Sequence, residues 1–122
     1  MRLSEAIRAG AKMKPMGIGA STADPHSEKV CALGAAACGG GLTSETQYSV
    51  YNALSTRWPI LREKVHQDVP RGATWRGDVM EHIWTRNDAG KTTREEIADW
   101  VAQAEEEALK CGTLTREQLG YD

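Results

Sequence analysis

The amino-acid sequence predicts an all-α protein, a compact single domain of about five helices over residues 1–122. Three observations lead to this prediction. Apolar residues recur at helical spacing in several segments, most of which begin with a residue that can cap a helix. No segment shows the sustained apolar–polar alternation that is typical of strands. Glycine, proline and polar residues gather between these segments, which predicts long loops at residues 15–27 and 66–77.

The first helix is expected to begin beside Ser4, a residue type that caps helices, and to end near Lys14. Pro15 ends it because proline lacks a backbone N–H and disfavours helix in the residue before it. The apolar side chains of this helix lie four positions apart and so share one face: Leu3, Ile7 and Ala11.

A second helix is expected from about residue 28 to residue 38, with Ser27 as its cap. Its side chains are small or apolar around most of the circumference: Val30, Cys31, Leu33, Gly34, Ala35, Ala37 and Cys38. A helix of this kind is normally buried, and small side chains let neighbouring backbones approach closely. The glycines at 39–41 are expected to end it, since glycine readily adopts the left-handed cap conformation.

The third helix is expected to begin with a capping pair, Ser44 and Gln47. Its apolar stripe runs through Tyr48, Val50, Tyr51, Leu54 and Trp58. Pro59 can begin a short fourth helix, whose apolar residues are Ile60, Leu61 and Val65. Phenylalanine is absent, so we expect the large indole side chains to anchor the core: Trp58, Trp75, Trp84 and Trp100.

Two more helices are expected in the C-terminal part of the chain. Asp78 can cap one that runs to about Arg86, with apolar residues Val79, Met80, Ile83 and Trp84. A turn at 87–91 leads to the clearest helix, residues 93–110, whose capping pair is Thr92 and Glu95. Its apolar residues are Ile97, Trp100, Val101, Ala104, Ala108 and Leu109. The residues expected to end it and to cap one last turn are Gly112, Thr115 and Gln118.

Composition and charge limit the classes of function. Basic and acidic residues number 15 and 17, for a formal charge of -2, so the chain offers no basic field to a nucleic-acid backbone. No apolar run approaches the roughly 20 residues that span a bilayer, and the charged, amphipathic N-terminal segment is unlike a secretory signal. Three cysteines without a disulfide pattern favour a reduced compartment. We therefore expect a small soluble cytoplasmic protein that binds neither membranes nor nucleic acids.

The cysteines are expected to be buried and unreactive. Cys31 and Cys38 lie seven residues apart on the second helix, about 10 Å along its axis, which is too far for two ligands of one zinc ion. Two alternatives stay open: a metal site that adds Cys111 and a histidine, and a cysteine nucleophile paired with a histidine. The histidines are His26, His66 and His82. The sequence assigns no metal ligand, no cofactor and no catalytic residue.

The polar run "WTRNDAGKTTREE", residues 84–96, is the candidate binding region. Its side chains lie between two amphipathic helices, where they can grip a phosphorylated or carboxylated ligand: Arg86, Asn87, Asp88, Lys91 and Arg94. Amides of a glycine loop, "MGIGAST" or "GGGLTS", and a tryptophan or tyrosine ring would complete a nucleotide site. The structural alternative is a turn at Asn87 and Asp88 before a capped helix. The adjacent carboxylates at 105–107 are expected to face solvent.

Three segments carry a resemblance: "LSEAIRAGAKMKP", "CALGAA" and "NDAGKTTREEIADWV", which cover roughly a third of the chain. In order and spacing they are similar to a group of small uncharacterised bacterial and phage proteins. That group has a Cys-Ala-Leu-Gly-Ala segment and a later Asn-Asp turn before a Thr-x-Glu-Glu helix. The resemblance implies a common helical fold and a phage or prophage source, and it assigns no catalytic residue.

The sequence favours a non-catalytic protein-interaction module that self-associates as a homo-oligomer. If the resemblance holds, it is a virion accessory subunit or an inhibitor of a host protein, in the host cytoplasm or the virion. The alternative is a protein that binds a small ligand, a nucleotide or another anion, through residues 86–94. A thiol- or metal-dependent enzyme is the least favoured interpretation.

Overall fold

The predicted fold class is confirmed by the computed structural model, which describes residues 1–65 and 77–122. These residues form six α-helices, two short 3₁₀ helices and no strand. The α-helices are α1 (Leu3–Met13), α2 (Ala32–Gly39), α3 (Val50–Arg57), α4 (Val79–Asp88), α5 (Arg94–Lys110) and α6 (Arg116–Leu119), and the 3₁₀ helices are η1 (Ala20–Ala23) and η2 (Pro59–Arg62). Of the predicted loop at 66–77, residues 66–76 lie outside the described residues.

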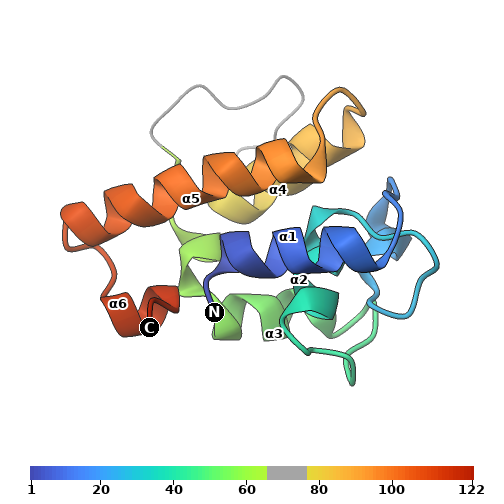
Figure 1. The fold of residues 1–122 in the computed structure, drawn as a ribbon, viewed down its shortest axis with the longest axis horizontal. Coiled ribbons are helices and arrows are strands. Elements are labelled where there is room, and N and C mark those ends of the chain that lie inside the picture. The colour runs from blue at the N-terminus through green and yellow to red at the C-terminus, as the bar shows by residue number, and fades with distance from the viewer. Residues whose placement is uncertain (66–76) are drawn as a thin grey trace.

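The helices stack in layers around one core (Figure 1). α5 and α4 lie along the upper side of the view, α1 crosses the middle, and α3 and α6 lie below. The chain ends lie near each other, because Gly120 packs against the carbonyl of Met1. The indole nitrogen of Trp58 donates to the same carbonyl at 3.0 Å. Within the described residues, no helix has the length and apolarity that crossing a membrane requires.

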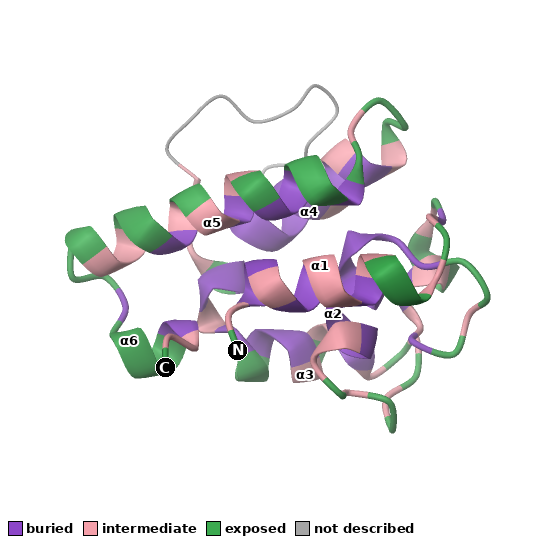
Figure 2. Cartoon of the chain, in the orientation of Figure 1, coloured by how far each residue is buried: buried purple, intermediate pink, exposed green. Residues whose placement is uncertain are grey.

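Helix α2 is the centre of this core, as its small side chains predicted. All of its residues except Gly39 are buried, and it packs most closely against α1 (Figure 2). A methyl group at Gly10 would collide with the carbonyl oxygen of Ala35, and one at Gly39 would collide with that of Ala6. The backbones of α1 and α2 therefore touch where glycine removes the side chain.

The start of α2 was predicted wrongly, four residues too early. Val30 pairs with Met16 in an isolated bridge, in which the Val30 amide donates to Pro15 at 2.9 Å. This pairing holds the residues before Cys31 extended, so the helix begins at Ala32 with Cys31 as its cap. The predicted end is confirmed, because Gly41 has a positive φ of 79° directly after the cap residue.

Other helix starts also differ from the predictions. α1 is capped by Arg2, whose amide donates to Glu5 at 2.9 Å, so Ser4 lies inside the helix and is buried. α3 begins at Val50 instead of residue 44, and Tyr48 is 95% exposed rather than part of an apolar stripe. The fourth helix is the 3₁₀ turn η2.

The C-terminal predictions are largely confirmed. Asp78 caps α4 by accepting from the amide of Glu81 at 2.8 Å, and Thr115 with Gln118 caps α6. α5 covers Arg94–Lys110 as predicted, although its capping pair is Thr93 and Glu96, one residue later. α4 extends through Asp88, so the predicted turn at 87–91 starts two residues later than expected.

Tryptophan anchors the core less than the sequence suggested. Trp58 is buried, whereas Trp84 and Trp100 are half-buried at the edge of the core. Trp75 lies outside the described residues.

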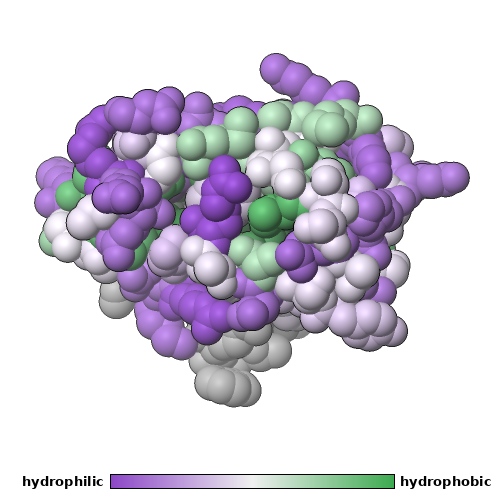
Figure 3. All heavy atoms as spheres, turned by 90° about the horizontal axis from the view of Figure 1, so that it is seen from below, coloured by the Kyte–Doolittle hydropathy of each residue, from purple (hydrophilic) through white to green (hydrophobic). Residues whose placement is uncertain are grey.

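Much of the surface seen from below is hydrophilic, with a small hydrophobic area near its middle (Figure 3). Among the described residues, the large apolar side chains that are exposed are Met1, Met13, Ile18 and Tyr48.

Candidate binding sites

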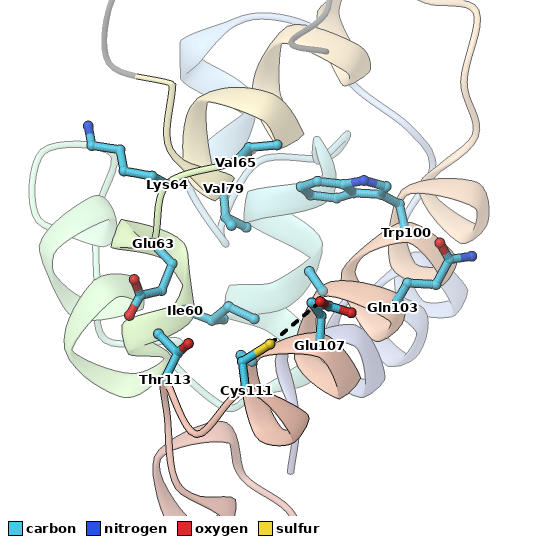
Figure 4. Close-up of a pocket in the computed structure, with 12 residues that line it drawn as sticks. Ile60, Glu63, Lys64, Val65, Val79, Trp100, Gln103, Glu107, Cys111 and Thr113 are labelled. Atoms are coloured by element: carbon cyan, nitrogen blue, oxygen red, sulfur yellow. Dashed lines mark hydrogen bonds between the residues drawn. The ribbon is translucent and has the colours of Figure 1, made fainter. Parts of the chain in front are cut away.

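A groove of about 760 Å³ lies beside α5, and we call it the α5 groove (Figure 4). One wall consists of α5 residues: Trp100, Gln103, Ala104, Glu107, Ala108 and Cys111. The other consists of η2, the segment after it and neighbouring residues: Ile60, Glu63, Lys64, Val65, Val79 and Thr113. The close-up shows Trp100 at one end of the α5 wall and Cys111 at the other.

The α5 wall is one face of the helix. Counted from Trp100, its residues follow at 3, 4, 7, 8 and 11 positions, the spacing that places side chains on one side of an α-helix. The wall is therefore about 16 Å long, at 1.5 Å per residue. The small residues Ala104 and Ala108 lie along its middle, and both are half-buried. This face is mixed, because it also carries the exposed polar side chains of Gln103 and Glu107. It differs from the core face of α5, where Ile97, Ala98 and Val101 are buried.

A buried histidine supports Trp100. The rings of His82 and Trp100 stack with centroids 3.8 Å apart and planes 15° apart. His82 is only 1% exposed, and neither of its ring nitrogens has a hydrogen-bond partner among the described residues. Burial, with a smaller contribution from the charge of Arg86, lowers the pKa of His82 to about 4. The imidazole is therefore neutral at neutral pH, and the indole rests against a fixed ring.

The three cysteines do not meet. Cys31 and Cys38 are buried as predicted, and burial raises the pKa of both thiols. The prediction was wrong for Cys111, which is exposed because it lies at the C-cap of α5, and its thiol donates to Glu107 at 3.6 Å. Among the described residues, no group of three or more His, Cys, Asp or Glu side chains is arranged to hold a metal ion. His66 lies outside those residues.

A second hollow of about 350 Å³, which we call the Asp88 pocket, lies among η1, the start of α2, α3 and α4. It contains two half-buried aromatic side chains, Tyr51 and Trp84, and the carboxylate of Asp88. Its remaining lining residues are Gly19, Ala20, Cys31, Leu33 and Met80. Burial raises the pKa of the Tyr51 hydroxyl, and the neighbouring Cys31 and Asp88 raise it further.

The predicted binding residues at 86–94 have separate roles. Asn87 is fully buried: its carbonyl oxygen accepts from the amide of Ala32 at 3.0 Å, and its amide nitrogen donates to the carbonyl of Gly17 at 3.0 Å. Asp88 accepts from the amide of Gly19 at 3.1 Å. These bonds join the end of α4 to the first residue of α2 and to the loop before it, one of the two glycine loops proposed for a ligand.

The three basic residues of the same run differ in burial. Arg94 is buried, and its guanidinium donates to the carbonyls of Val30 at 3.2 Å and Ala11 at 3.1 Å. Lys91 is exposed, and Arg86 is half-buried. Of the five predicted residues, Asp88 lines the Asp88 pocket, and the three cations are not among the residues that line it.

The prediction that Glu105 faces solvent is wrong, because its side chain is fully buried. It lies on the core face of α5, four residues after Val101, and accepts from the hydroxyl of Ser4 at 2.5 Å. Burial raises the pKa of its carboxyl group. The spacing of Glu105 from the apolar residues of α5 indicated a position on the core face, but its charge favoured a prediction of exposure. Glu106 and Glu107 are exposed as predicted.

Comparison with known proteins returned no matching family, no matching curated protein and no matching solved structure.

Proposed function

We propose that this protein is a non-catalytic protein-interaction module that self-associates through the α5 groove. The observation that carries the proposal is the pattern of the α5 wall: a supported indole, two alanines and a cysteine on one helical face, with the exposed polar side chains of Gln103 and Glu107 between them. Aromatic side chains held in one position make strong interface anchors, since little conformational freedom is lost on binding. Small residues between them allow another helix to approach closely.

The occupant that fits this wall is α5 of a second copy. If the two α5 helices pair in antiparallel fashion about a two-fold axis, Trp100 of each copy lies against the Cys111 end of the other. The bulky end of the wall then meets its narrow end. In this register Ala104 lies opposite Glu107 of the second copy and Gln103 lies opposite Ala108, so each small alanine meets a longer polar side chain. A surface that is complementary to itself in this way favours a symmetric dimer. One groove of this length supports a modest interface, so we expect a dissociation constant in the micromolar range.

Light scattering coupled to size-exclusion chromatography tests this proposal from about 10 µM to about 500 µM protein. The wild type should shift from monomer to dimer over this range. Ala104→Glu places a charge in the middle of the wall and should keep the protein monomeric, with an unchanged circular dichroism spectrum. Ala102→Glu is the matched control, because Ala102 is on α5 and does not line the groove. A monomer at every concentration, or a dimer that survives Ala104→Glu, would refute the proposal.

Two finer predictions from the sequence stay predictions. A phage or prophage role, in the host cytoplasm or in a virion, rests on the sequence resemblance alone. Anion binding by Arg86, Lys91 and Arg94 gains no support from the geometry, because Arg94 is occupied by two backbone carbonyls inside the protein.

A further inference from the structure

The Asp88 pocket presents a carboxylate next to aromatic rings. Trp84 and Asp88 lie four residues apart on α4, so their side chains share one face of the helix. Tyr51 lines the same hollow from α3, and Leu33 and Met80 supply apolar surface. This site is separate from the α5 groove, since the two share no lining residue.

The charge of Asp88 is only partly compensated. Both hydrogen bonds that it accepts, from the amide of Gly19 and the side-chain amide of Asn87, end on Oδ1. Oδ2 has no partner among the described residues, and no basic side chain there forms an ion pair with Asp88. The two donors to Oδ1 are uncharged, so they orient the carboxylate without neutralising it.

Aromatic rings add a second attraction for positive charge. The face of an indole or phenol ring attracts cations, and the effect grows as the cation leaves water. A half-buried hollow with two such rings and a carboxylate repels phosphate and carboxylate groups. The pocket is therefore suited to a ligand of the opposite charge to the one that residues 86–94 suggested from sequence.

We propose that the Asp88 pocket binds a small organic cation, an amidinium, guanidinium or primary amine carried on a flat or apolar body. The cationic group would pair with Oδ2 of Asp88, and the body would lie against Trp84 and Tyr51. At about 350 Å³, the pocket is at the lower end of the size range of small-molecule sites.

Isothermal titration calorimetry with the full chain tests this proposal by comparing benzamidine, which is cationic, with its neutral isostere benzamide. Benzamidine should bind saturably, and benzamide at least about ten-fold more weakly. Two guanidinium compounds are titrated in the same way. Agmatine represents a free metabolite, and N-acetyl-arginine methylamide represents an arginine within a peptide. The tighter binder of these two identifies the source.

Three variants complete the test. Asp88→Asn keeps an oxygen for the two donors and removes the charge, so benzamidine affinity should fall at least about ten-fold. Glu106→Gln, an equal loss of charge on the exposed side of α5, should leave it unchanged. Ala20→Arg, at an exposed position on the pocket rim, brings a cation of the protein itself to Asp88 and should abolish binding even if Asp88→Asn does not fold. Equal affinities for benzamidine and benzamide, an unchanged affinity in Asp88→Asn or Ala20→Arg, or no saturable binding of any cationic probe would overturn the proposal.

Discussion

Replacing His82 by phenylalanine should make the protein less sensitive to acid. His82 is buried against Trp100, and burial lowers its pKa from 6.5 to about 4 in the folded state. An unfolded chain exposes the imidazole and binds a proton near pH 6.5. The unfolded state therefore gains protons first as the pH falls, so the stability that neutral His82 contributes is present above pH 6.5 and is lost between 6.5 and about 4.

The size of the effect follows from the two pKa values. The gap between 6.5 and about 4, at 1.36 kcal/mol for each pH unit, corresponds to about 3 kcal/mol when the titration is complete. Between pH 7 and pH 4.5 only part of this titration takes place, and the free energy of unfolding falls by about 2.5 kcal/mol. A domain of this size has a free energy of unfolding of roughly 5–15 kcal/mol, so the loss is a large share of the total.

Urea unfolding at pH 7 and pH 4.5, followed by circular dichroism, measures this loss in the wild type and in His82→Phe. Phenylalanine keeps a ring against Trp100 and has no proton to gain, so the variant should lose about 2.5 kcal/mol less between the two pH values. Glu105 works in the opposite direction: burial raises its pKa, so its contribution to stability is lost as the pH rises. Because Glu105 is present in both proteins, its contribution cancels in the comparison. Equal losses in the two proteins would refute a neutral buried His82.

Two further predictions concern the contacts that hold α2 in place. Gly10→Ala should destabilise the protein by about 3 kcal/mol or more, or prevent folding, because its methyl group would collide with the backbone of α2. Lys12→Ala, on the exposed side of α1, is the control and should change the free energy of unfolding by less than about 0.5 kcal/mol. Urea unfolding measures both. Asn87→Ala leaves the buried amide of Ala32 and a buried carbonyl without partners and should cost about 2–4 kcal/mol. Asn87→Asp keeps an oxygen for the Ala32 amide, so this amide should be better protected from hydrogen exchange in Asn87→Asp than in Asn87→Ala. Equal protection in the two variants would contradict the role of Asn87 Oδ1 as the acceptor.

The sequence was sufficient for the fold class because its helical patterns are strong and its caps are local. Asp78 and the pair Thr115–Gln118 act within one turn of the chain, so their prediction needs no tertiary information. The start of α2 could not be found in this way. It depends on the bridge between Val30 and Met16, a contact across a loop that no local pattern encodes.

The candidate sites were less predictable, because each depends on which elements meet. The polar run at 86–94 attracted attention for its charge, yet Asn87 and Arg94 use their polar groups to hold other segments of the chain. Trp84 and Trp100 were expected in the core for their size. Both are half-buried and line hollows instead.

The described indoles differ in how they relate to the core. Close contact between α1 and α2, at Gly10 and Gly39, places main-chain atoms of the two helices against each other. Among the described tryptophans, Trp58 is the one that is fully buried in this core. Trp84 and Trp100 are left half-buried at the margin of the core, each on the wall of a hollow. Aromatic surface is thus present at both proposed binding sites, on α4 at the Asp88 pocket and on α5 at the α5 groove.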